Sequence, residues 1–211
     1  MPKIKVFASC VALLGDLVDS RHSDRPTSHV ALLEAIEQTN AKVPQLDPLR
    51  VTVGDEIQGV YATMGDALTA SFTLRNILHG TTDIRFGFGG GEVRIVDAER
   101  GIQDGSGWIL AREAINAAEE SADDTPGIRS AVRDERPEAN PLTEAMSQLI
   151  DAEIHRLGDG PRASLTALWN GLDNKSSAKL LDISPSANSQ RVRTNAIRTL
   201  VEAMRALARL A

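Results

Sequence analysis

Residues 6–16 read VFASCVALLGD, and this stretch decides the fold. Its first nine residues are almost continuously apolar, without the polar alternation of a strand that has one face in water. They therefore predict a buried strand. Gly15 and Asp16 follow, and both residue types are common where a strand gives way to a turn. We expect Asp16 at the end of this strand, with its carboxylate held on rigid backbone.

The pattern downstream of this strand alternates between helix and strand. Apolar residues recur at helical spacing in three segments, residues 27–41, 64–78 and 108–120. β-forming residues gather in three others, residues 49–53, 57–61 and 83–96. The resulting β-α-β-β-α-β order is typical of a ferredoxin-like fold, so we expect an α+β domain over residues 1–124 with its helices on one side of the sheet.

Glycines mark two places where this domain is expected to turn. Gly54, Asp55 and Glu56 lie between two short β-rich runs, which predicts a hairpin with Asp55 at its tip. Gly87 and residues 89–91 lie inside the β-rich stretch 83–96, which predicts a sharp bend between two strands.

The second half of the chain has a different character. Residues 125–140 are polar, show no period and include Pro126 and Pro137, which predicts a linker. From Pro141 onward the pattern is helical throughout, so we expect residues 141–211 to form a small all-α domain.

Within this tail, residues 174–198 have the spacing of a helix-turn-helix. A short helix over 176–181 and a turn over 182–184 precede a second helix, for which Ser184 is the expected N-cap and Pro185 lies in the first turn. Such a second helix enters the major groove of double-stranded DNA. Its hydroxyl, amide and guanidinium groups suit base edges and phosphates. The expected DNA contacts are Ser184, Ser186, Ser189, Gln190, Arg191 and Arg193.

Two residues depart from the usual helix-turn-helix pattern. Asp182 stands where the turn usually has glycine, and Asn188 stands where an apolar residue usually packs inward. The alternative is a helical bundle that serves dimerisation and leaves its arginines in solvent.

Charge is divided along the chain in the same way. The net charge of −6 averages a front of 11 basic and 19 acidic side chains over residues 1–124 with a tail of eight basic and three acidic ones over 162–211. A basic tail fits phosphate contacts, which dominate affinity for DNA. The hydrophobic share of 42% is sufficient for a packed core and argues against disorder.

Other features exclude several classes of protein. The single cysteine, Cys10, excludes an internal disulfide and a cysteine-built zinc site. No apolar run approaches the ~20 residues of a membrane span, and the N-terminus does not have the pattern of a signal peptide. We expect a cytoplasmic protein without a membrane partner.

Two aspartates of the front are candidate metal ligands. Asp16 and Asp55 each follow an apolar strand, and in the expected sheet they converge at one edge. Paired carboxylates on rigid backbone suit a hard cation such as Mg²⁺ or Mn²⁺, which also takes phosphate oxygens. Asp19 and Glu56 can add negative charge. The alternative is that the Gly-Asp pairs 15–16 and 54–55 are only turns.

Four segments of the chain resemble the SatD family. They are LLGDLVDSR at 13–21, VGDEIQG at 53–59, RFGFG at 85–89 and AREA at 111–114. The helix-turn-helix tail is similar to the C-terminal part of that family. The resemblance implies an architecture more than an activity.

The front half is also similar to the nucleotidyl cyclase palm of class III and GGDEF-type cyclases. That resemblance implies that Asp16 and Asp55 hold two metal ions on a nucleoside triphosphate. It also implies a nucleotide site around these ligands, comprising Gly15, Gly54, Glu56, Asp19 and Ser20.

One helix of the palm supplies residues that class III cyclases need for catalysis. The frame Asn-x-Ala-Ala-Arg of class III cyclases corresponds here to residues 108–112, WILAR. By this resemblance Arg112 is the catalytic arginine of an active enzyme, but Trp108 replaces the asparagine, and an indole cannot accept a hydrogen bond. The resemblance therefore implies metal or nucleotide binding more strongly than turnover.

The sequence favours a DNA-binding transcriptional regulator whose front domain senses a metal–nucleotide ligand or mediates dimerisation. A metal-dependent nucleotidyl- or phosphoryl-transfer enzyme of the cyclase type is the alternative, and a protein-interaction module is a third possibility. Related palm sites lie between two subunits, and helix-turn-helix proteins commonly bind DNA as two-fold dimers. We expect a homodimer in each of the first two cases.

Overall fold

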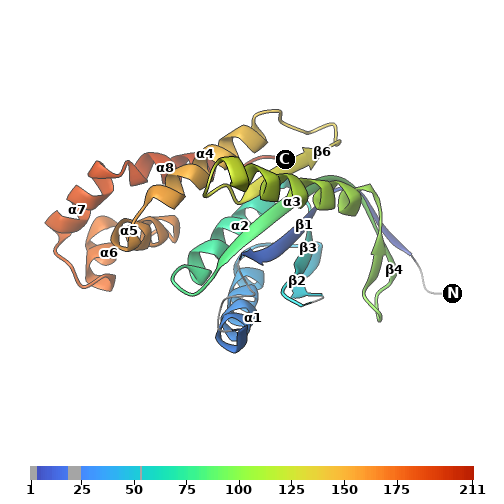
Figure 1. The fold of residues 1–211 in the computed structure, drawn as a ribbon, viewed down its shortest axis with the longest axis horizontal. Coiled ribbons are helices and arrows are strands. Elements are labelled where there is room, and N and C mark those ends of the chain that lie inside the picture. The colour runs from blue at the N-terminus through green and yellow to red at the C-terminus, as the bar shows by residue number, and fades with distance from the viewer. Residues whose placement is uncertain (1–3, 19–24, 53) are drawn as a thin grey trace.

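A computed structural model describes residues 4–18, 25–52 and 54–211 of the chain. Figure 1 shows a central sheet with helices on both sides and a group of C-terminal helices at one end. None of the helices in these three ranges is both long enough and apolar enough to cross a bilayer. The elements are β1 (Lys5–Val18), α1 (Arg25–Lys42), β2 (Asp47–Val51), β3 (Ile57–Tyr61), α2 (Met64–Leu78), β4 (Asp83–Asp97), β5 (Ile102–Asp104), α3 (Ser106–Asp124), β6 (Ser130–Asp134), α4 (Thr143–Arg156), α5 (Asp159–Trp169), α6 (Asn174–Leu180), α7 (Pro185–Thr194) and α8 (Ile197–Leu207).

The sheet has the strand order β2-β3-β1-β4-β5, and β6 adds to β4. β1 pairs antiparallel with both β3 and β4, and β2 pairs antiparallel with β3. With α1 after β1 and α2 after β3, this is the ferredoxin-like arrangement. The predicted mixed α+β front with a palm-like order of elements is confirmed.

Helices cover both faces of the sheet, which corrects the expectation of helices on one side. Val11 and Leu13 of β1 belong to the core shared with α1 and α2. The alternate residues Cys10 and Ala12 pack on the opposite face with Ala111 of α3. This two-sided burial is the physical reason why β1 shows no polar alternation.

β4 is one continuous strand of 15 residues, so the predicted bend within it is wrong. Its glycines instead admit α3 to the sheet. A Cβ atom at Gly89 would lie 2.0 Å from the Gly107 carbonyl oxygen, and one at Gly87 would lie 2.3 Å from that of Ala111. No side chain fits between these backbones, and such close approach is a common reason for glycine in a strand.

Residues 125–140 contain a strand where the sequence predicts a linker. β6 pairs in parallel with β4 over Phe86–Gly90, and its first two residues are buried. Two of the charges that suggest a solvated segment form an internal pair, since Arg136 binds the Asp134 carboxylate at 2.9 Å and both side chains are at most 8% exposed. Other charges of the segment, including Glu135 and Glu138, are exposed to solvent.

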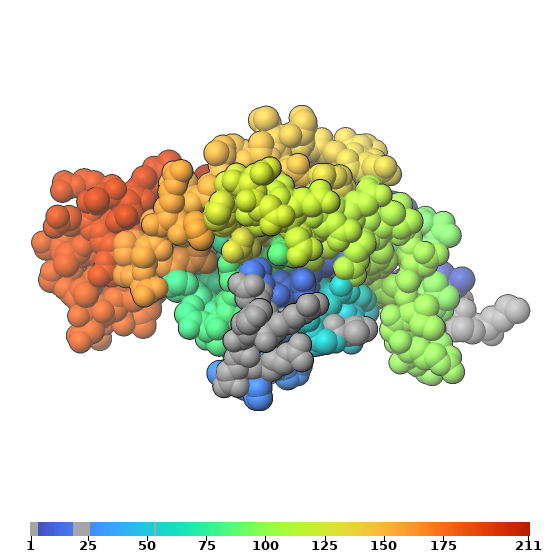
Figure 2. All heavy atoms as spheres, in the orientation of Figure 1, coloured from blue at the N-terminus to red at the C-terminus, as the bar shows by residue number. Residues whose placement is uncertain are grey.

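The C-terminal helices share the hydrophobic core of the sheet domain. Leu200, Met204 and Leu207 of α8 belong to the same core cluster as α1, α2 and β1. The backbone N–H of Gly65 in α2 donates to the Leu210 carbonyl at 3.0 Å, and a Cβ there would lie 2.4 Å from the Ala208 carbonyl oxygen. In Figure 2 the orange and red atoms of the C-terminal part lie directly against green atoms of the sheet domain.

Candidate functional site

The acidic pair lies where β1 passes the β2–β3 turn. Gly15 pairs with Ile57 at the start of β3, so the next residue, Asp16, lies beside the turn that includes Asp55 and Glu56. β1 continues to Val18, which corrects the prediction that Asp16 follows the end of its strand. The strand places the Asp16 carboxylate on rigid backbone, as a metal ligand requires.

The environment of Asp16 is short of positive charge. Burial raises the pKa of Asp16 first, and the nearby Asp55 carboxylate raises it further. The guanidinium of Arg85, its partner on β4, lies 4.0 Å away and also binds Glu119 at 3.0 Å, so it offsets this effect only in part. A cation between the two aspartates would relieve the repulsion between them.

Two carboxylates fit one mode of Mg²⁺ or Mn²⁺ binding. Over the ranges that the structure describes, no group of three or more His, Cys, Asp or Glu side chains is placed to hold a metal ion. Mg²⁺ commonly binds one or two carboxylates and completes its shell with water and substrate phosphates. The donor set of Asp16 and Asp55 fits that mode and does not fit an all-protein metal cage.

Arg112 of α3 is already paired with an acid of the same site. Its Nη2 donates to Glu56 Oε2 at 2.6 Å, while half of its side chain stays exposed. The pair borders a cavity of about 380 Å³ that Gln103 and Trp108 also line. Trp108 Nε1 and Gln103 Oε1 are buried there without a hydrogen-bond partner among the described residues. An unpaired donor and an unpaired acceptor thus lie buried in two residues of the cavity wall.

The two glycines predicted to contact nucleotide have different environments. Gly15 is buried within β1, and a Cβ there would lie 2.7 Å from Ile57 Cγ1, so its small size serves packing and it leaves the set of candidate contacts. Gly54 is exposed in the turn with φ of 67°, a conformation that favours glycine. Asp19 and Ser20, also predicted here, lie outside the described residues.

Two tail helices meet in a tight turn at the predicted place. α6 ends at Leu180, and α7 begins at Pro185 with the Ser184 hydroxyl accepting the Ala187 N–H at 3.1 Å. Asp182 lies between them with φ of 51°, the left-handed conformation that Gly, and less often Asp or Asn, adopts. This explains how aspartate occupies a position where glycine is usual.

Asn188 explains the other departure from the pattern. Its side chain is fully buried and accepts a hydrogen bond from Ser164 Oγ of α5 at 2.8 Å. Its Nδ2 donates to Asn174 Oδ1 of α6 at 3.0 Å. A polar network therefore replaces the usual apolar contact and fixes α7 on α5 and α6.

The six predicted DNA contacts are not equivalent. Ser184 uses its hydroxyl as the N-cap of α7, and Arg191 is half-buried and donates to the Gly160 carbonyl at 3.0 Å. The others lie on the exposed side of α7, namely Ser186, Ser189, Gln190 and Arg193. We call these four residues the α7 face.

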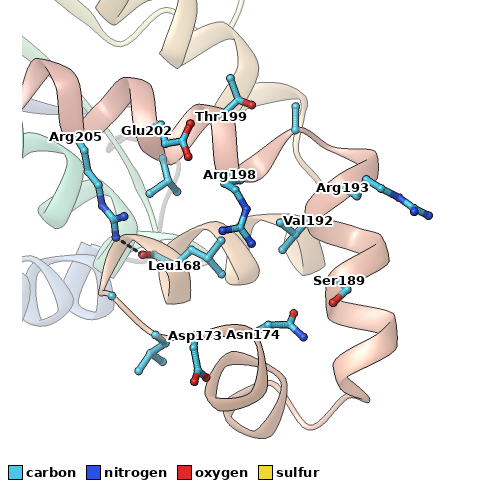
Figure 3. Close-up of a pocket in the computed structure, with 14 residues that line it drawn as sticks. Leu168, Asp173, Asn174, Ser189, Val192, Arg193, Arg198, Thr199, Glu202 and Arg205 are labelled. Atoms are coloured by element: carbon cyan, nitrogen blue, oxygen red, sulfur yellow. Dashed lines mark hydrogen bonds between the residues drawn. The ribbon is translucent and has the colours of Figure 1, made fainter.

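A cavity of about 690 Å³ lies beside the α7 face. Figure 3 shows Ser189 and Arg193 on α7, with Arg198 and Arg205 on α8 across the cavity. Arg205 donates to the Leu168 carbonyl at 2.9 Å. Asp173 and Glu202 also line this cavity, so its charge is mixed. The exposed basic groups that line it are Arg193, Arg198 and Arg205.

Arg85 is a site residue that sequence reasoning did not assign. Strand pairing brings Arg85 to the site, because Arg85 of β4 lies directly opposite Asp16 of β1. The signal is present in the sequence only once the pairing of the two strands is known, since RFGFG by itself shows an arginine at one end of a β-rich run.

The fold and these sites define an α+β protein with a ferredoxin-like sheet, an aspartate pair beside a hairpin turn and a helical tail. The SatD family model matches residues 10–210, and the chain belongs to the SatD family. A comparison with curated protein sequences gives no match.

Several solved structures are similar to the chain at low identity. One is the catalytic core of a rhodopsin-guanylyl cyclase with converted specificity in complex with ATPαS, 15% identical, covering 60% of this chain and 86% of that one with a TM-score of 0.43. The guanylyl cyclase domain of RhoGC from the aquatic fungus Blastocladiella emersonii is 14% identical, covering 54% and 78% with a TM-score of 0.40. A regulator of polyketide synthase expression from Bifidobacterium adolescentis is 11% identical, covering 96% and 86% with a TM-score of 0.29.

Proposed function

We propose that this protein is a DNA-binding transcriptional regulator whose sheet domain binds a nucleotide together with a divalent cation. The observation that carries the proposal is the α7 face, a row of exposed hydroxyl, amide and guanidinium groups on a helix anchored at its buried side. These groups suit base edges and phosphates in the major groove of double-stranded DNA. A cytoplasmic location is part of this proposal.

The support beneath the α7 face is rigid. Asn188 ties α7 to two neighbouring helices, and Val192 packs into the shared core. Lys175 and Lys179 of α6 are exposed beside it and add positive charge near the expected DNA backbone. Such groups position a protein on the duplex without reading its sequence.

The nucleotide site rests on the acidic pair. Asp16 and Asp55 would hold the Mg²⁺ or Mn²⁺ ion, and Arg112 would contact the phosphates once it parts from Glu56. The ion, when bound, neutralises phosphate charge. At Gly54, none of the described residues has an atom within 4 Å of the position of a Cβ.

Coupling between the sites has a structural route. The C-terminal residues 208–211 pack on the start of α2, and α2 packs on β1 and β3, which flank the acidic pair. A ligand alters DNA binding only if it stabilises one arrangement of these elements over another. A homodimer with two-fold symmetry would place two α7 faces on successive half-sites.

Fluorescence anisotropy of the full chain with a labelled random duplex tests DNA binding. We expect binding at low salt that weakens steeply as salt rises, because released counterions dominate the affinity. Absence of binding at low salt, with and without nucleotide and Mg²⁺, would refute the proposal.

A metal-dependent nucleotidyl- or phosphoryl-transfer enzyme is the second candidate, favoured by the pairing of Arg112 with Glu56, which follows Asp55 in the turn beside Asp16. Arg112 would then stabilise charge on the reacting phosphates. Each nucleoside triphosphate is incubated with Mg²⁺ or Mn²⁺ and analysed by chromatography. Product that forms with the wild type and is lost with Asp55→Ala would establish this function, and equal product from both would show that the assigned site is wrong.

A further inference from the structure

Another polar cavity lies where the sheet domain meets the tail helices. It measures about 360 Å³ and is bounded by the α2–β4 connection on one side and by the end of α4 and the start of α5 on the other. The groups around it that can donate hydrogen bonds to an anion are Arg75, His79, Thr81, Thr82, His155 and Arg162. It is distinct from the acidic pair and from the α7 face.

Arg162 is the unusual residue of this cavity. It is only 4% exposed, and its Nε has no hydrogen-bond partner in the described part of the chain. No carboxylate of that part lies within 4.0 Å of its guanidinium. Buried arginines are normally paired, because removing the charge from water is costly unless a counter-charge replaces the lost hydration.

The nearby acids are already engaged by other groups. Asp151 accepts from Arg75 Nη1 at 2.5 Å, from the Arg129 N–H at 2.9 Å and from Ser130 Oγ at 2.6 Å. Asp83, which also lines the cavity, accepts from Arg129 Nε at 2.6 Å and lies 3.6 Å from Arg75. These two carboxylates pair with Arg75 and Arg129. The third acid, Asp159, is fully exposed and lies 3.6 Å from His79, so Arg162 has no direct carboxylate partner among the described residues.

Burial and positive charge lower the pKa of two groups in this cavity. Burial first, and then the charge of Arg75, lower the pKa of Arg162 to about 10, so the guanidinium remains charged at neutral pH. Burial and the charge of Arg162 also lower the pKa of His79, against the opposing effect of Asp159 and Asp83.

We propose that this cavity binds a small anion of the phosphate class, with Arg162 as its main ligand. A phosphate group offers several acceptor oxygens, which match the guanidinium, hydroxyl and imidazole donors around the cavity. The cavity is large enough for free phosphate or for a phosphate group borne by a small molecule. Because its walls come from both the sheet domain and the tail, bound anion would hold the two together.

Calorimetric titration of the full chain with inorganic phosphate tests the site, at constant ionic strength and with chloride and acetate as comparison anions. We expect binding of phosphate that acetate and chloride do not reproduce. Parallel titration with glycerol phosphate distinguishes the source: tighter binding than that of inorganic phosphate indicates a phosphorylated small molecule, and equal or weaker binding indicates free phosphate. Absence of phosphate binding, or equal responses to phosphate, chloride and acetate, overturns the proposal.

Arg162→Met separates this role from a structural one. We expect the variant to lose about tenfold or more in phosphate affinity, since its charged donors are gone. We also expect it to unfold at a higher temperature than the wild type in phosphate-free buffer, because an unpaired buried charge has been removed. The matched control Arg156→Gln, at an exposed arginine of α4, should change neither quantity. Unchanged phosphate affinity in Arg162→Met overturns the proposal.

A readout on the unaltered protein covers the case in which Arg162→Met does not fold. Phosphate in the cavity should shift the imidazole NMR signals of His79 and raise its pKa, while the exposed His29 on α1 stays unchanged. Failure of phosphate to move the His79 signals selectively overturns the proposal.

Discussion

Arg112 of α3 donates to Glu56 of the β2–β3 turn at 2.6 Å and so ties the helix on one face of the sheet to the turn that carries Asp55. The pair has two consequences. It engages the guanidinium of Arg112, the residue expected to bind phosphate. It also means that Arg112 does not neutralise the carboxylates of Asp16 and Asp55. A nucleotide with a bound cation would supply phosphate oxygens to Arg112 and a positive charge to Asp16 and Asp55.

Arg112→Gln should weaken the binding of a nucleoside triphosphate in the presence of Mg²⁺ by about tenfold or more. Hydrogen bonds to charged groups contribute about 1.5–3 kcal/mol, and about 1.4 kcal/mol is a tenfold change in affinity. Titration of the fluorescent analogue mant-ATP measures the change. Arg100→Gln, which alters an exposed arginine of the β4–β5 turn, is the matched control and should have no effect. Equal affinities of the two variants would remove Arg112 from the site.

Asp55→Asn should abolish the saturable part of Mn²⁺ binding that is seen by electron paramagnetic resonance. One of only two carboxylate ligands is lost, and the amide carries no charge to replace it. Glu153→Gln, at an exposed carboxylate of α4, controls for the change of one negative charge. Undiminished Mn²⁺ binding in Asp55→Asn would show that the ion lies elsewhere.

Asp16→Asn should stabilise the protein at pH 7 when no divalent cation is present. Burial and neighbouring carboxylates raise the pKa of Asp16 in the folded state, so its ionisation at neutral pH lowers stability. The effect should be small, roughly 0–1 kcal/mol, because the side chain is 41% exposed and solvent screens the repulsion. Urea unfolding measures it, and a loss of stability in the variant would contradict this account of the site.

The glycines of β4 have a structural role that is measurable. Gly89→Ala should lower the free energy of unfolding by about 1–3 kcal/mol or more, because the added methyl group meets backbone atoms of α3 that cannot rotate away. Gly158→Ala is the matched control, since no atom in the described part of the chain lies within 4 Å of the position of its Cβ. Equal stabilities in urea would show that α3 does not press on the sheet at Gly89.

Cys10 should react slowly with thiol reagents in the folded protein. Burial raises the pKa of its thiol to about 11 from an ordinary value of 9.0, so the reactive thiolate is scarce at pH 8. The raised pKa also predicts that its contribution to stability is present below pH 9 and is lost as pH rises through about 11, because only the unfolded thiol ionises readily in that range. Rapid modification by Ellman's reagent at pH 8 without denaturant would contradict this.

The sequence predicts the order of elements well because local pattern dominates it. The apolar run of residues 6–14 identifies β1, and the three residues 54–56 identify the turn between β2 and β3. Ser184 and Pro185 mark the start of α7 to the residue. Each of these signals depends on neighbours in sequence, which the chain itself displays.

The features that sequence reasoning missed depend on contacts distant in sequence. β6 was hidden because Asp134 and Arg136 pair with each other and not with water. The glycines of β4 suggest a bend in the sequence, and their real role is seen only in the fold, where α3 packs closely against them. Arg191 has the type and spacing of a DNA contact, but its guanidinium is bound to the Gly160 carbonyl.

The DNA affinity of Arg193→Gln compared with that of Arg156→Gln tests the central claim most directly. Both replace one exposed arginine, but only Arg193 lies on the α7 face. We predict that Arg193→Gln weakens binding to a labelled duplex and lowers the slope of log affinity against log salt by about 1, whereas Arg156→Gln leaves both unchanged. Identical affinity and slope in the two variants would contradict the claim that α7 binds DNA.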